Sequence, residues 1–571
     1  MGISTGKLPG KVSDGRAVNK NQPAEAEHTP ASGPLHLWWQ GGLIYQIYPR
    51  SFVDSNGDGV GDLPGIISKL EYVAGLGVEA VWISPFFKSP MADFGYDIAD
   101  YRAVDPLFGK LEDFDRLLAK AHNLGLKVMI DQVLSHTSVE HAWFTESRSD
   151  RENARADWYV WADPKADGGP PNNWLSIFGG IAWEWEPRRA QYYLHNFLGS
   201  QPDLNFHNPQ VRRAVLDNLQ FWLDRGADGV RLDAINFCFH DPQLRNNPPK
   251  PVEQRTGRGF RPDNPYAHQY HVYDNTRPEN LPFIEELRAL VDRYPGAVTL
   301  GEISAEDSNA AMVEYTRPGR LHLGYSFELL GAERSPAHIR ATVEGALAAS
   351  PDAWPCWSLS NHDVQRVLSR WGQANSPPHL ATQLTALVCS LRGAVCIYQG
   401  EELGLREADV PFESLRDPYG KAFWPNFKGR DGCRTPLPWT ADARGGFSSG
   451  APWLPLPPEQ LALAVEVQEH ESSSTLQAFR RFMRWRRQHP ALRWGDIEFL
   501  LATDSVLAFT RHYNGERLLA AFNLSAQHAS ADLPRVLAGA VLSGHGLPEG
   551  KLEGARLAIP PHGVVYCRLG S

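Results

Sequence analysis

Short apolar runs alternate with amphipathic segments along most of the chain, and this alternation constrains the fold more than any other feature. The runs are rich in β-branched and aromatic residues and cover 43–48, 78–83, 126–130, 229–232, 298–301, 320–327, 357–359 and 394–398. Helix-like segments lie between them, at 64–76, 111–124, 209–225, 280–294 and 378–391. Uniformly apolar strands joined by helices are typical of a parallel sheet covered on both faces. Eight such units over more than 400 residues predict an α/β fold, a (β/α)8 TIM barrel rather than an open sheet.

Two connections are too long to be simple loops, and the pattern changes near the C-terminus. Residues 136–205 are rich in Trp, Gly and Pro, which predicts a small B domain inserted after the third strand. Residues 236–279 are polar and contain many prolines, which predicts a long flap after the fourth strand. Short alternating runs separated by turns predict a C-terminal antiparallel β domain over 497–571. The catalytic barrel is then expected from 37–135 and 206–496.

Composition excludes several classes of protein. Hydrophobic residues make up 42% of the 571 residues and charged residues 21%, so the chain is neither disordered nor fibrous. The 56 basic and 66 acidic residues give a net charge of −10 without any Lys/Arg run, which argues against nucleic acid as a partner. The 18 Trp, 18 Tyr and 25 Phe are equally typical of a sugar-binding enzyme and of a large aromatic core.

The N-terminus and the cysteines bear on location. Residues 1–36 are polar and lack the apolar centre of a secretory signal, so we expect a disordered or tag-like tail. No stretch approaches about 18 uninterrupted apolar residues, so we expect no membrane partner. Six cysteines without CxxC spacing are expected to be buried small hydrophobes: Cys238, Cys356, Cys389, Cys396, Cys433 and Cys567. These features favour a cytoplasmic location. The sequence does not determine the oligomeric state, and a homodimer is one possibility.

Polar residues end four of the predicted strands. They are Asp131 and His136 after the third strand, Arg231 and Asp233 on the fourth, Glu302 on the fifth, and His362 and Asp363 after the seventh. The carboxyl ends of barrel strands meet at one rim, where the functional residues of this fold lie. Each residue alone could be a helix cap or a structural histidine, but the set as a whole indicates a catalytic centre.

Paired carboxyl groups at one rim match the chemistry of glycosidic bond cleavage. A retaining mechanism needs two such groups about 5–5.5 Å apart, one nucleophilic and one protonated. Arg231 lies two residues before Asp233 and is expected to hold it ionised. Glu302 is expected to have a raised pKa and to donate a proton to the leaving oxygen. Asp363 could bind ring hydroxyls and favour positive charge in the transition state.

These segments resemble the α-amylase family of glycoside hydrolases. The similar stretches are 131–136 (DQVLSH), 229–234 (GVRLDA), 301–302 (GE) and 360–363 (SNHD), and 201–205 (QPDLN) is similar to an additional region of the α-glucosidase and oligo-1,6-glucosidase branch. The resemblance covers roughly residues 40–571. It implies a (β/α)8 domain with an inserted B domain and a C-terminal β domain.

The same resemblance implies a role for each residue. Asp233 would be the nucleophile, Glu302 the general acid/base and Asp363 the stabiliser of the transition state. Three further residues would bind the sugar on the non-reducing side of the scissile bond: His136, Arg231 and His362. One departure stands out, because the family usually has Asn where this chain has Ser135.

Two further segments indicate exo action. Residues 94–98 (FGYDI) resemble a stretch in which Tyr96 would stack on glucose and Asp97 would bind its terminal hydroxyls. Arg434, in the segment 429–436 (GRDGCRTP), would pair with Asp97 and close the pocket behind one glucosyl unit; the alternative is a structural surface ion pair. The B-domain rings Phe178 and Phe197 could form the pocket wall, or the core of that domain.

Ala234 and the flap bear on the substrate. In the resembling branch, valine after the nucleophile accompanies α-1,6 action and smaller residues accompany α-1,4 action, so Ala234 favours short α-1,4-linked substrates such as maltose. A flap that narrows the acceptor side favours short α-glucosides over polymers and allows glucosyl transfer to sugar or alcohol acceptors. The open alternatives are an oligo-1,6-glucosidase, a sucrose or trehalose isomerase, and a non-catalytic relative.

The loop DSNGDGVGD after the first strand carries oxygen ligands at alternate positions. Its spacing is similar to the start of an EF-hand loop, but Gly65 stands where the bidentate Glu would be. The resembling branch binds a divalent ion here, through Asp54, Asn56, Asp58, the carbonyl of Val60, and Asp62. We expect a structural Ca²⁺, with Mg²⁺ as the second candidate and an Asx/Gly turn without metal as the alternative.

Overall fold

The computed structural model describes residues 36–255, 263–348 and 354–570. The predicted tail therefore lies outside the described residues except for His36, and the predicted flap is described on either side of 256–262. No helix in the described ranges is long and apolar enough to cross a membrane.

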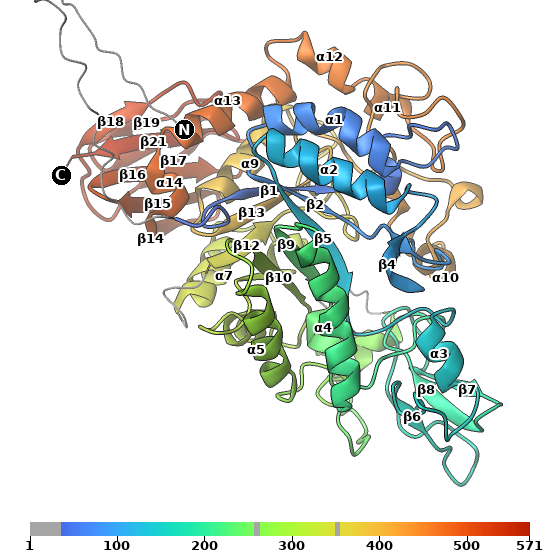
Figure 1. Ribbon diagram of the computed structural model, residues 1–571. Helices are drawn as coiled ribbons and strands as arrows, with labels where there is room; N and C mark the ends of the chain where they lie inside the picture. The colour runs from blue at the N-terminus through green and yellow to red at the C-terminus, as the bar shows by residue number, and fades with distance from the viewer. Residues whose placement is uncertain (1–35, 256–262, 349–353, 571) are drawn as a thin grey trace, which may run out of the picture. The chain divides into compact units, whose positions relative to one another are not determined.

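Eight parallel strands close into a barrel, which confirms the predicted fold (Figure 1). In order around the barrel they are β1 (Leu43–Ile47), β2 (Ala80–Ile83), β5 (Lys127–Val133), β9 (Gly229–Asp233), β10 (Val298–Ile303), β11 (Leu323–Ser326), β12 (Trp354–Ser358) and β13 (Ala394–Tyr398). The last strand pairs with the first through register contacts such as Tyr45 with Ile397. The strands are buried almost throughout, which explains why their sequences are apolar without alternation.

Helices cover the outside of the barrel. They are α1 (Leu63–Gly75), α2 (Leu111–Asn123), α4 (Pro209–Asp224), α5 (Asn280–Val291), α6 (Ser308–Tyr315), α7 (Pro336–Ala348), α8 (Val367–Arg370) and α9 (His379–Ser390). In α2, Phe114, Leu117, Leu118 and Ala121 form the buried stripe that a 3.6-residue period places on one face. The start of α4 follows from local chemistry, because the Asn208 side chain accepts the N–H of Gln210 at 2.8 Å.

A small sheet stands between β5 and α4. The strands β6 (Trp161–Ala162), β8 (Gln191–Leu194) and β7 (Trp183–Glu186) form it in that order, beside α3 (Ala142–Ser147) (Figure 1). Its own core includes Trp174 and Trp183, whose rings stack with 5.8 Å between centroids. A further pair, β3 (Phe87–Lys88) and β4 (Asp100–Val104), follows β2. The exact boundaries 136–205 stay a prediction.

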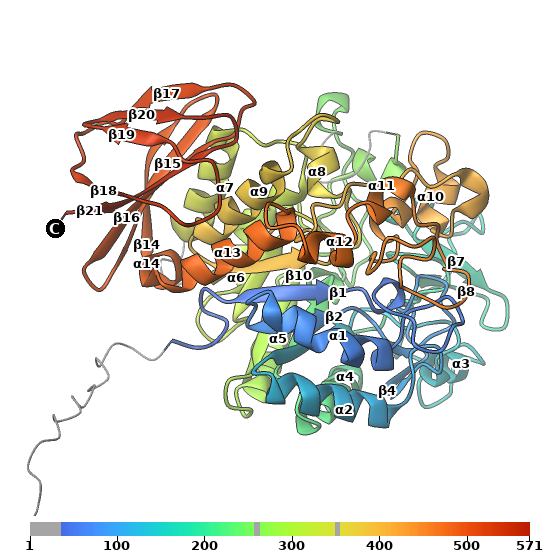
Figure 2. The same cartoon turned by 90° about the horizontal axis from the view of Figure 1, so that it is seen from above.

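The last part of the chain forms two antiparallel sheets with a shared core (Figure 2). One contains β14 (Asp496–Ala502), β15 (Val506–Tyr513), β16 (Glu516–Asn523), β21 (Val564–Leu569) and β18 (Gly539–Leu542), and the other β17 (Ala529–Asp532), β20 (Arg556–Ile559) and β19 (Lys551–Glu553). Asn514 and Gly515 turn β15 into β16 with φ of 44° and 84°, as a two-residue hairpin requires. The predicted C-terminal β domain is thus confirmed.

Several helices connect the barrel to this domain. They are α10 (Pro418–Ala422), α11 (Pro458–Leu461), α12 (Val465–Glu469), α13 (Thr475–Arg487) and α14 (Pro490–Trp494). The buried Arg511 of β15 donates to the carbonyl oxygens of Leu391 and Leu492 at 2.8 and 3.0 Å, which ties the sheet to the end of α9 and to α14. All six cysteines are buried and free, as the sequence predicts.

Candidate functional site

One buried arginine organises three carboxylates at the rim of the barrel. Arg231 contacts Asp131 at 2.8 Å and Asp233 at 2.6 Å through Nη1, and Glu302 at 2.6 Å through Nη2. Strand register explains this arrangement: Arg231 lies opposite Asp131 in the β5–β9 pairing and opposite Leu300, two residues before Glu302, in the β9–β10 pairing. Side chains two apart point to the same face of a strand. The two predicted catalytic carboxyls therefore share one guanidinium.

Burial dominates the electrostatics of these two carboxyls. Desolvation raises the pKa of Glu302 to about 8, although Arg231 opposes the shift. Desolvation likewise raises the pKa of Asp233 to about 7, and Asp131 and Asp363 add to it. The predicted Arg231–Asp233 ion pair is present, but its positive charge is shared and the net shift is upward rather than downward. Glu302 is still the weaker acid, as a proton donor beside an ionised nucleophile should be.

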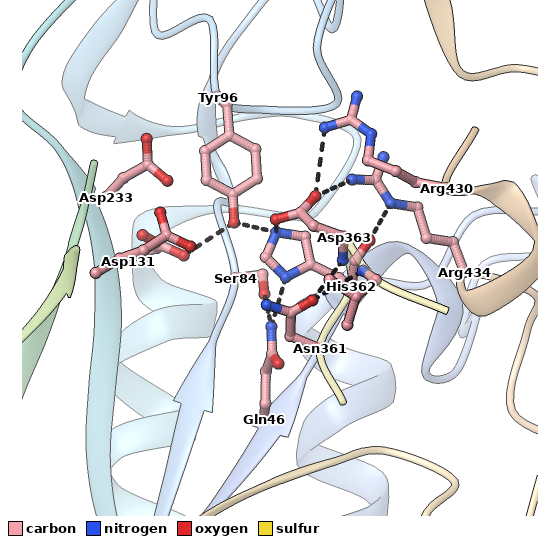
Figure 3. A network of polar contacts seen from close by, with 12 residues as sticks. Gln46, Ser84, Tyr96, Asp131, Asp233, Asn361, His362, Asp363, Arg430 and Arg434 are labelled. Atoms are coloured by element: carbon pink, nitrogen blue, oxygen red, sulfur yellow. Dashed lines mark hydrogen bonds and ion pairs between the residues drawn. The ribbon is translucent and has the colours of Figure 1, made fainter. Parts of the chain in front are cut away.

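Asp363 lies in the opposite electrostatic environment. Its Oδ1 is 2.7 Å from Arg434 Nη2 and 3.3 Å from Arg430 Nη1 (Figure 3). Burial favours the neutral acid, but His362, Arg434 and Arg430 together outweigh burial and hold the pKa of Asp363 well below its ordinary value. This carboxylate therefore stays ionised beside two weaker acids, which suits a group that stabilises positive charge.

Tyr96 and His362 link the carboxylate of Asp131 to that of Asp363. Burial lowers the pKa of His362 to about 3, so its ring is neutral. The Gln46 amide donates to Nδ1 at 2.7 Å, which leaves the ring proton on Nε2. That nitrogen lies 2.5 Å from the Tyr96 hydroxyl, and the hydroxyl donates to Asp131 Oδ2 at 3.1 Å (Figure 3). The two rings lie parallel, with 5.3 Å between centroids.

His136 is also neutral, because burial lowers its pKa to about 4. Ser135, the residue that departs from the family pattern, places its hydroxyl 3.0 Å from Nδ1. The other nitrogen, Nε2, lies 3.0 Å from the carbonyl oxygen of Tyr96 and 3.2 Å from the Gln201 amide. Gln201 also donates to Asp93 Oδ2 at 3.2 Å. The serine thus supplies a local partner for the histidine ring.

The predicted pair of Asp97 with Arg434 is wrong. The buried Asp97 carboxylate accepts hydrogen bonds from Ser89 Oγ at 2.9 Å and from the N–H groups of Ala92 and Asp93 at 2.8 and 3.0 Å. It therefore closes its own turn. Arg434 instead binds Asp363 and the carbonyl oxygen of His362, at 2.7 and 2.6 Å.

Asp93, rather than Asp97, pairs with an arginine of the segment 429–436, and that arginine is Arg430. Arg430 Nη2 lies 2.7 Å from Asp93 Oδ1 and 2.8 Å from Asp417 Oδ1, while Nη1 approaches Asp363. Sequence reasoning missed both residues, although Asp93 precedes Tyr96 by three positions and Arg430 lies in the same segment as Arg434. Asp93 and Asp97 are four residues apart, and so are Arg430 and Arg434. Which acid pairs with which arginine depends on the path of the backbone, and the sequence motif does not give that path.

The two B-domain phenylalanines lie at the site rather than in that domain's core. Phe197 is 4.9 Å from the ring of His136, and the Arg430 guanidinium lies 5.2 Å from the ring centroid of Phe178. The two rings are 6.3 Å apart, and both are half-buried. The core of the small sheet instead contains Trp174, Trp183 and their neighbours. Of the two alternatives for these rings, the geometry favours the pocket wall.

Ala234 has an unusual backbone. It follows Asp233 with φ of 39° and ψ of 45°, in the left-handed region, and starts the short 3-10 helix η2 (Ile235–Phe237). Its N–H points to Glu302 Oε2 at 3.2 Å. The residue after the predicted nucleophile therefore also holds the predicted acid/base.

The loop after β1 contains the predicted metal ligands in a closed turn. Asp54 accepts the N–H of Asn56 at 3.0 Å, Asn56 accepts that of Asp58 at 2.8 Å, and Asp58 accepts that of Val60 at 2.8 Å. Asp62 caps α1. Among the residues that the structure describes, no group of three or more His, Cys, Asp or Glu side chains is arranged to hold a metal ion. The oxygen donors suit a hard cation chemically, and an oxygen that accepts one N–H keeps a second lone pair.

Comparison with known proteins gives a consistent result. Residues 46–495 match the α-amylase catalytic domain, and residues 497–565 match the maltogenic amylase C-terminal domain. A probable α-glucosidase of Rhizobium meliloti (strain 1021) is 52% identical over 541 residues, covering 94% of this chain and 98% of that protein. An oligo-1,6-glucosidase of Heyndrickxia coagulans is 37% identical over 544 residues, covering 87% and 94%. The crystal structure of the α-glucosyl transfer enzyme XgtA superposes with a TM-score of 0.93 at 63% identity, covering 94% of this chain and 100% of that one.

Proposed function

The chain belongs to the α-amylase family of glycoside hydrolases, and from this premise we propose that it is a retaining, exo-acting α-glucosidase. Its proposed substrates are short α-1,4-linked glucosides such as maltose, from which it releases glucose at the non-reducing end. The relatives named α-glucosidase and oligo-1,6-glucosidase support the substrate class.

The proposed mechanism is a double displacement. Asp233 attacks the anomeric carbon while Glu302, protonated at neutral pH because burial raises its pKa, gives its proton to the leaving oxygen. Glu302 then takes a proton from water, and this water releases glucose with its α configuration retained. Asp363 stays ionised and stabilises the positive charge that develops on the sugar ring.

The observation that carries the exo assignment is the bridge that Arg430 makes between Asp93 and Asp363. It sets an ion pair beside the sugar-binding residues, with Phe178 against its face. We propose that this bridge closes the sugar site behind one glucosyl unit and so blocks the passage of a longer chain. Carboxylates beside it can accept hydrogen bonds from terminal hydroxyls.

A substrate panel tests this assignment. Initial rates on maltose, isomaltose, sucrose and trehalose, with product analysis, separate the α-1,4 glucosidase from the oligo-1,6-glucosidase and from an isomerase. We expect the highest kcat/KM on maltose and only glucose from the non-reducing end of longer maltooligosaccharides. Internal cleavage of these oligosaccharides would contradict the exo assignment.

Replacement of Ala234 by valine tests the linkage preference. Two added methyl groups beside the left-handed turn should crowd the leaving sugar of maltose, and a β-branched residue is poorly suited to a φ of 39°. We expect the ratio of kcat/KM for maltose to that for isomaltose to fall by roughly tenfold, about 1.4 kcal/mol. Ala234→Ser is the matched control, with an expected change below about threefold. An unchanged ratio in the valine variant would show that linkage is selected elsewhere.

Glucosyl transfer is the second candidate activity. It is supported by the high similarity to a protein described as an α-glucosyl transfer enzyme. It is also supported by the flap residue Asn264, which donates to the hydroxyl of Tyr419, the ring that packs against Phe178. Incubation with concentrated maltose and an alcohol acceptor should yield alkyl α-glucosides beside glucose. Glucose as the sole product would contradict it.

We also propose that the loop 54–62 binds a structural Ca²⁺, with Mg²⁺ as the alternative. Asp54, Asn56, Asp58, the carbonyl of Val60 and Asp62 would hold the ion, which would neutralise their charge and fix the start of α1. Removal of divalent ions with EDTA should then lower Tm by roughly 5 °C or more, and Ca²⁺ should restore it. Asp58→Asn should weaken the response. An unchanged Tm together with a metal-free protein by elemental analysis would contradict the proposal.

A further inference from the structure

The flap segment 264–276 contacts the pocket wall at its first end. Asn264 is 1% exposed and donates from Nδ2 to the carbonyl oxygen of Ile177 at 3.0 Å and to the hydroxyl of Tyr419 at 2.8 Å. Tyr419 packs edge-on against Phe178 with 5.2 Å between ring centroids. Phe178 is the ring that lies against the Arg430 guanidinium. The first end of the segment therefore supports the wall on the B-domain side.

Its second end contacts the loops that follow β9 and β10, the strands on which Asp233 and Glu302 lie. The Thr276 N–H donates to the carbonyl oxygen of Asn236 at 2.7 Å, and Asn236 Nδ2 donates to Thr276 Oγ1 at 2.9 Å and to the Ser304 carbonyl at 2.8 Å. Asn236 lies three residues after Asp233, and Ser304 two residues after Glu302. Thr276 has a φ of 53°, which is strained for a β-branched residue and persists only when its surroundings hold it.

Between these ends, His271 meets an acceptor at both ring nitrogens. Nδ1 lies 2.6 Å from Asp274 Oδ2, and Nε2 lies 2.8 Å from the carbonyl oxygen of Tyr266. A neutral imidazole has one N–H, so only the protonated ring donates to both. The ring also stacks on Tyr266 with 3.6 Å between centroids, and the Tyr266 N–H donates to Asn264 Oδ1 at 3.0 Å. The histidine is thus linked through Tyr266 to the end that supports the pocket wall.

The charges around His271 favour this protonated form. The ring is 5% exposed, and burial lowers its pKa, but Asp274, the Tyr266 carbonyl and Glu306 outweigh burial and raise the pKa above its ordinary value. Glu306 accepts the backbone N–H of His271 at 3.3 Å and pairs with Lys250 at 2.9 Å. The proton therefore stabilises the segment below about pH 6.5, and this contribution is lost as the pH rises through the higher pKa of the folded state.

We propose that protonated His271 is a positioning residue for acceptor selection: it holds the segment 264–276 between the pocket wall and the loops that follow β9 and β10, and so limits the entry of water. The inference rests on the proposed function, because it assigns this segment to the acceptor side. In this proposal His271 touches neither the sugar nor the reacting atoms.

The ratio of glucosyl transfer to hydrolysis tests the proposal. Water and an alcohol acceptor are activated by the same base, Glu302, so the protonation of Glu302 cancels in this ratio. With a nitrophenyl α-glucoside and a fixed concentration of glycerol, measured from about pH 5.5 to about pH 9, the wild-type ratio should fall by about threefold or more above the pKa of His271. In His271→Gln the ratio should be low and independent of pH. His338→Gln removes a histidine–carbonyl contact on α7 and should behave as the wild type.

Hydrogen exchange of the segment gives a readout that does not need turnover. Amides of 264–276, corrected for intrinsic exchange rates, should lose protection as the pH rises in the wild type and should lack it at all pH values in His271→Gln. A flat wild-type ratio, or unchanged protection in the variant, would overturn the proposal. If the variant does not fold, the wild-type profiles decide. If no α-glucoside is cleaved, the proposed function fails while the exchange measurement still tests the role of His271.

Discussion

Asp233→Asn is expected to lower kcat for maltose by at least roughly 10⁴-fold, because an amide oxygen cannot form the covalent glucosyl intermediate. The Asp233 carboxylate contacts Arg231 at 2.6 Å at the end of β9, and asparagine is close enough in shape to leave the barrel intact. The measurement is kcat under saturating maltose, together with the circular dichroism of both proteins. A loss of less than tenfold would show that another group attacks the sugar.

Asp228→Asn is a matched control, since Asp228 directly precedes β9 at the opposite end of the barrel. Its carboxylate pairs with Lys127 at 2.8 Å and accepts the N–H of Val128 at 2.9 Å, which are structural contacts. We expect kcat/KM to change by less than about threefold and the thermal stability to fall slightly. Equal losses of activity in both variants would mean that the barrel, rather than the nucleophile, had been damaged.

Glu302→Gln is expected to lower kcat for maltose by roughly 10²- to 10⁴-fold, since the leaving sugar then lacks a proton donor. The first displacement on a nitrophenyl glucoside should lose far less, because nitrophenolate leaves without protonation. Azide should rescue the second displacement and yield an α-glucosyl azide. Equal losses on both substrates would contradict the role of general acid.

The pH profile of the same variant checks the assignment independently. Because burial raises the pKa of Glu302 to about 8, wild-type kcat should fall as the pH rises through about 8, when the donor loses its proton. The nearby Asp233 adds to the raised pKa of Glu302, so the limbs of the profile report interacting groups rather than isolated ones. The alkaline limb should disappear in Glu302→Gln.

The barrel was predictable because each strand reads as a short buried run and each helix as an amphipathic segment. The run at 394–398 matches β13 residue for residue, and 43–48 and 229–232 differ from β1 and β9 by one residue. The turn at Asn514 and Gly515 was equally predictable from the sequence, since both residues tolerate the positive φ that the hairpin needs.

The site was predictable where strand geometry positions it and less so where loops do. Asp131, Arg231, Asp233 and Glu302 come together because the register of β5, β9 and β10 aligns alternate residues. The Asp93–Arg430 ion pair depends instead on how the turn around Asp97 closes, which is set by hydrogen bonds from Ser89, Ala92 and Asp93 to the Asp97 carboxylate. No spacing rule distinguishes Asp93 from Asp97 in that turn.

The charge interactions and pKa shifts of the site were the properties that the sequence predicted least well. The sequence places Arg231 beside Asp233 and suggests a lowered pKa, but it does not show that one guanidinium serves three buried carboxylates. It likewise gives no sign that His271 faces two acceptors, because Tyr266 and Asp274 meet it only in the folded flap.

Time-resolved ¹H NMR of the cleavage of a nitrophenyl α-maltoside tests the central claim most directly. A retaining, exo-acting α-glucosidase must release α-glucose first, with nitrophenyl α-glucoside as the other product, before the glucose anomers equilibrate. Early β-glucose would contradict the double displacement by Asp233 and Glu302, and release of intact maltose would contradict the closed pocket behind Asp93 and Arg430.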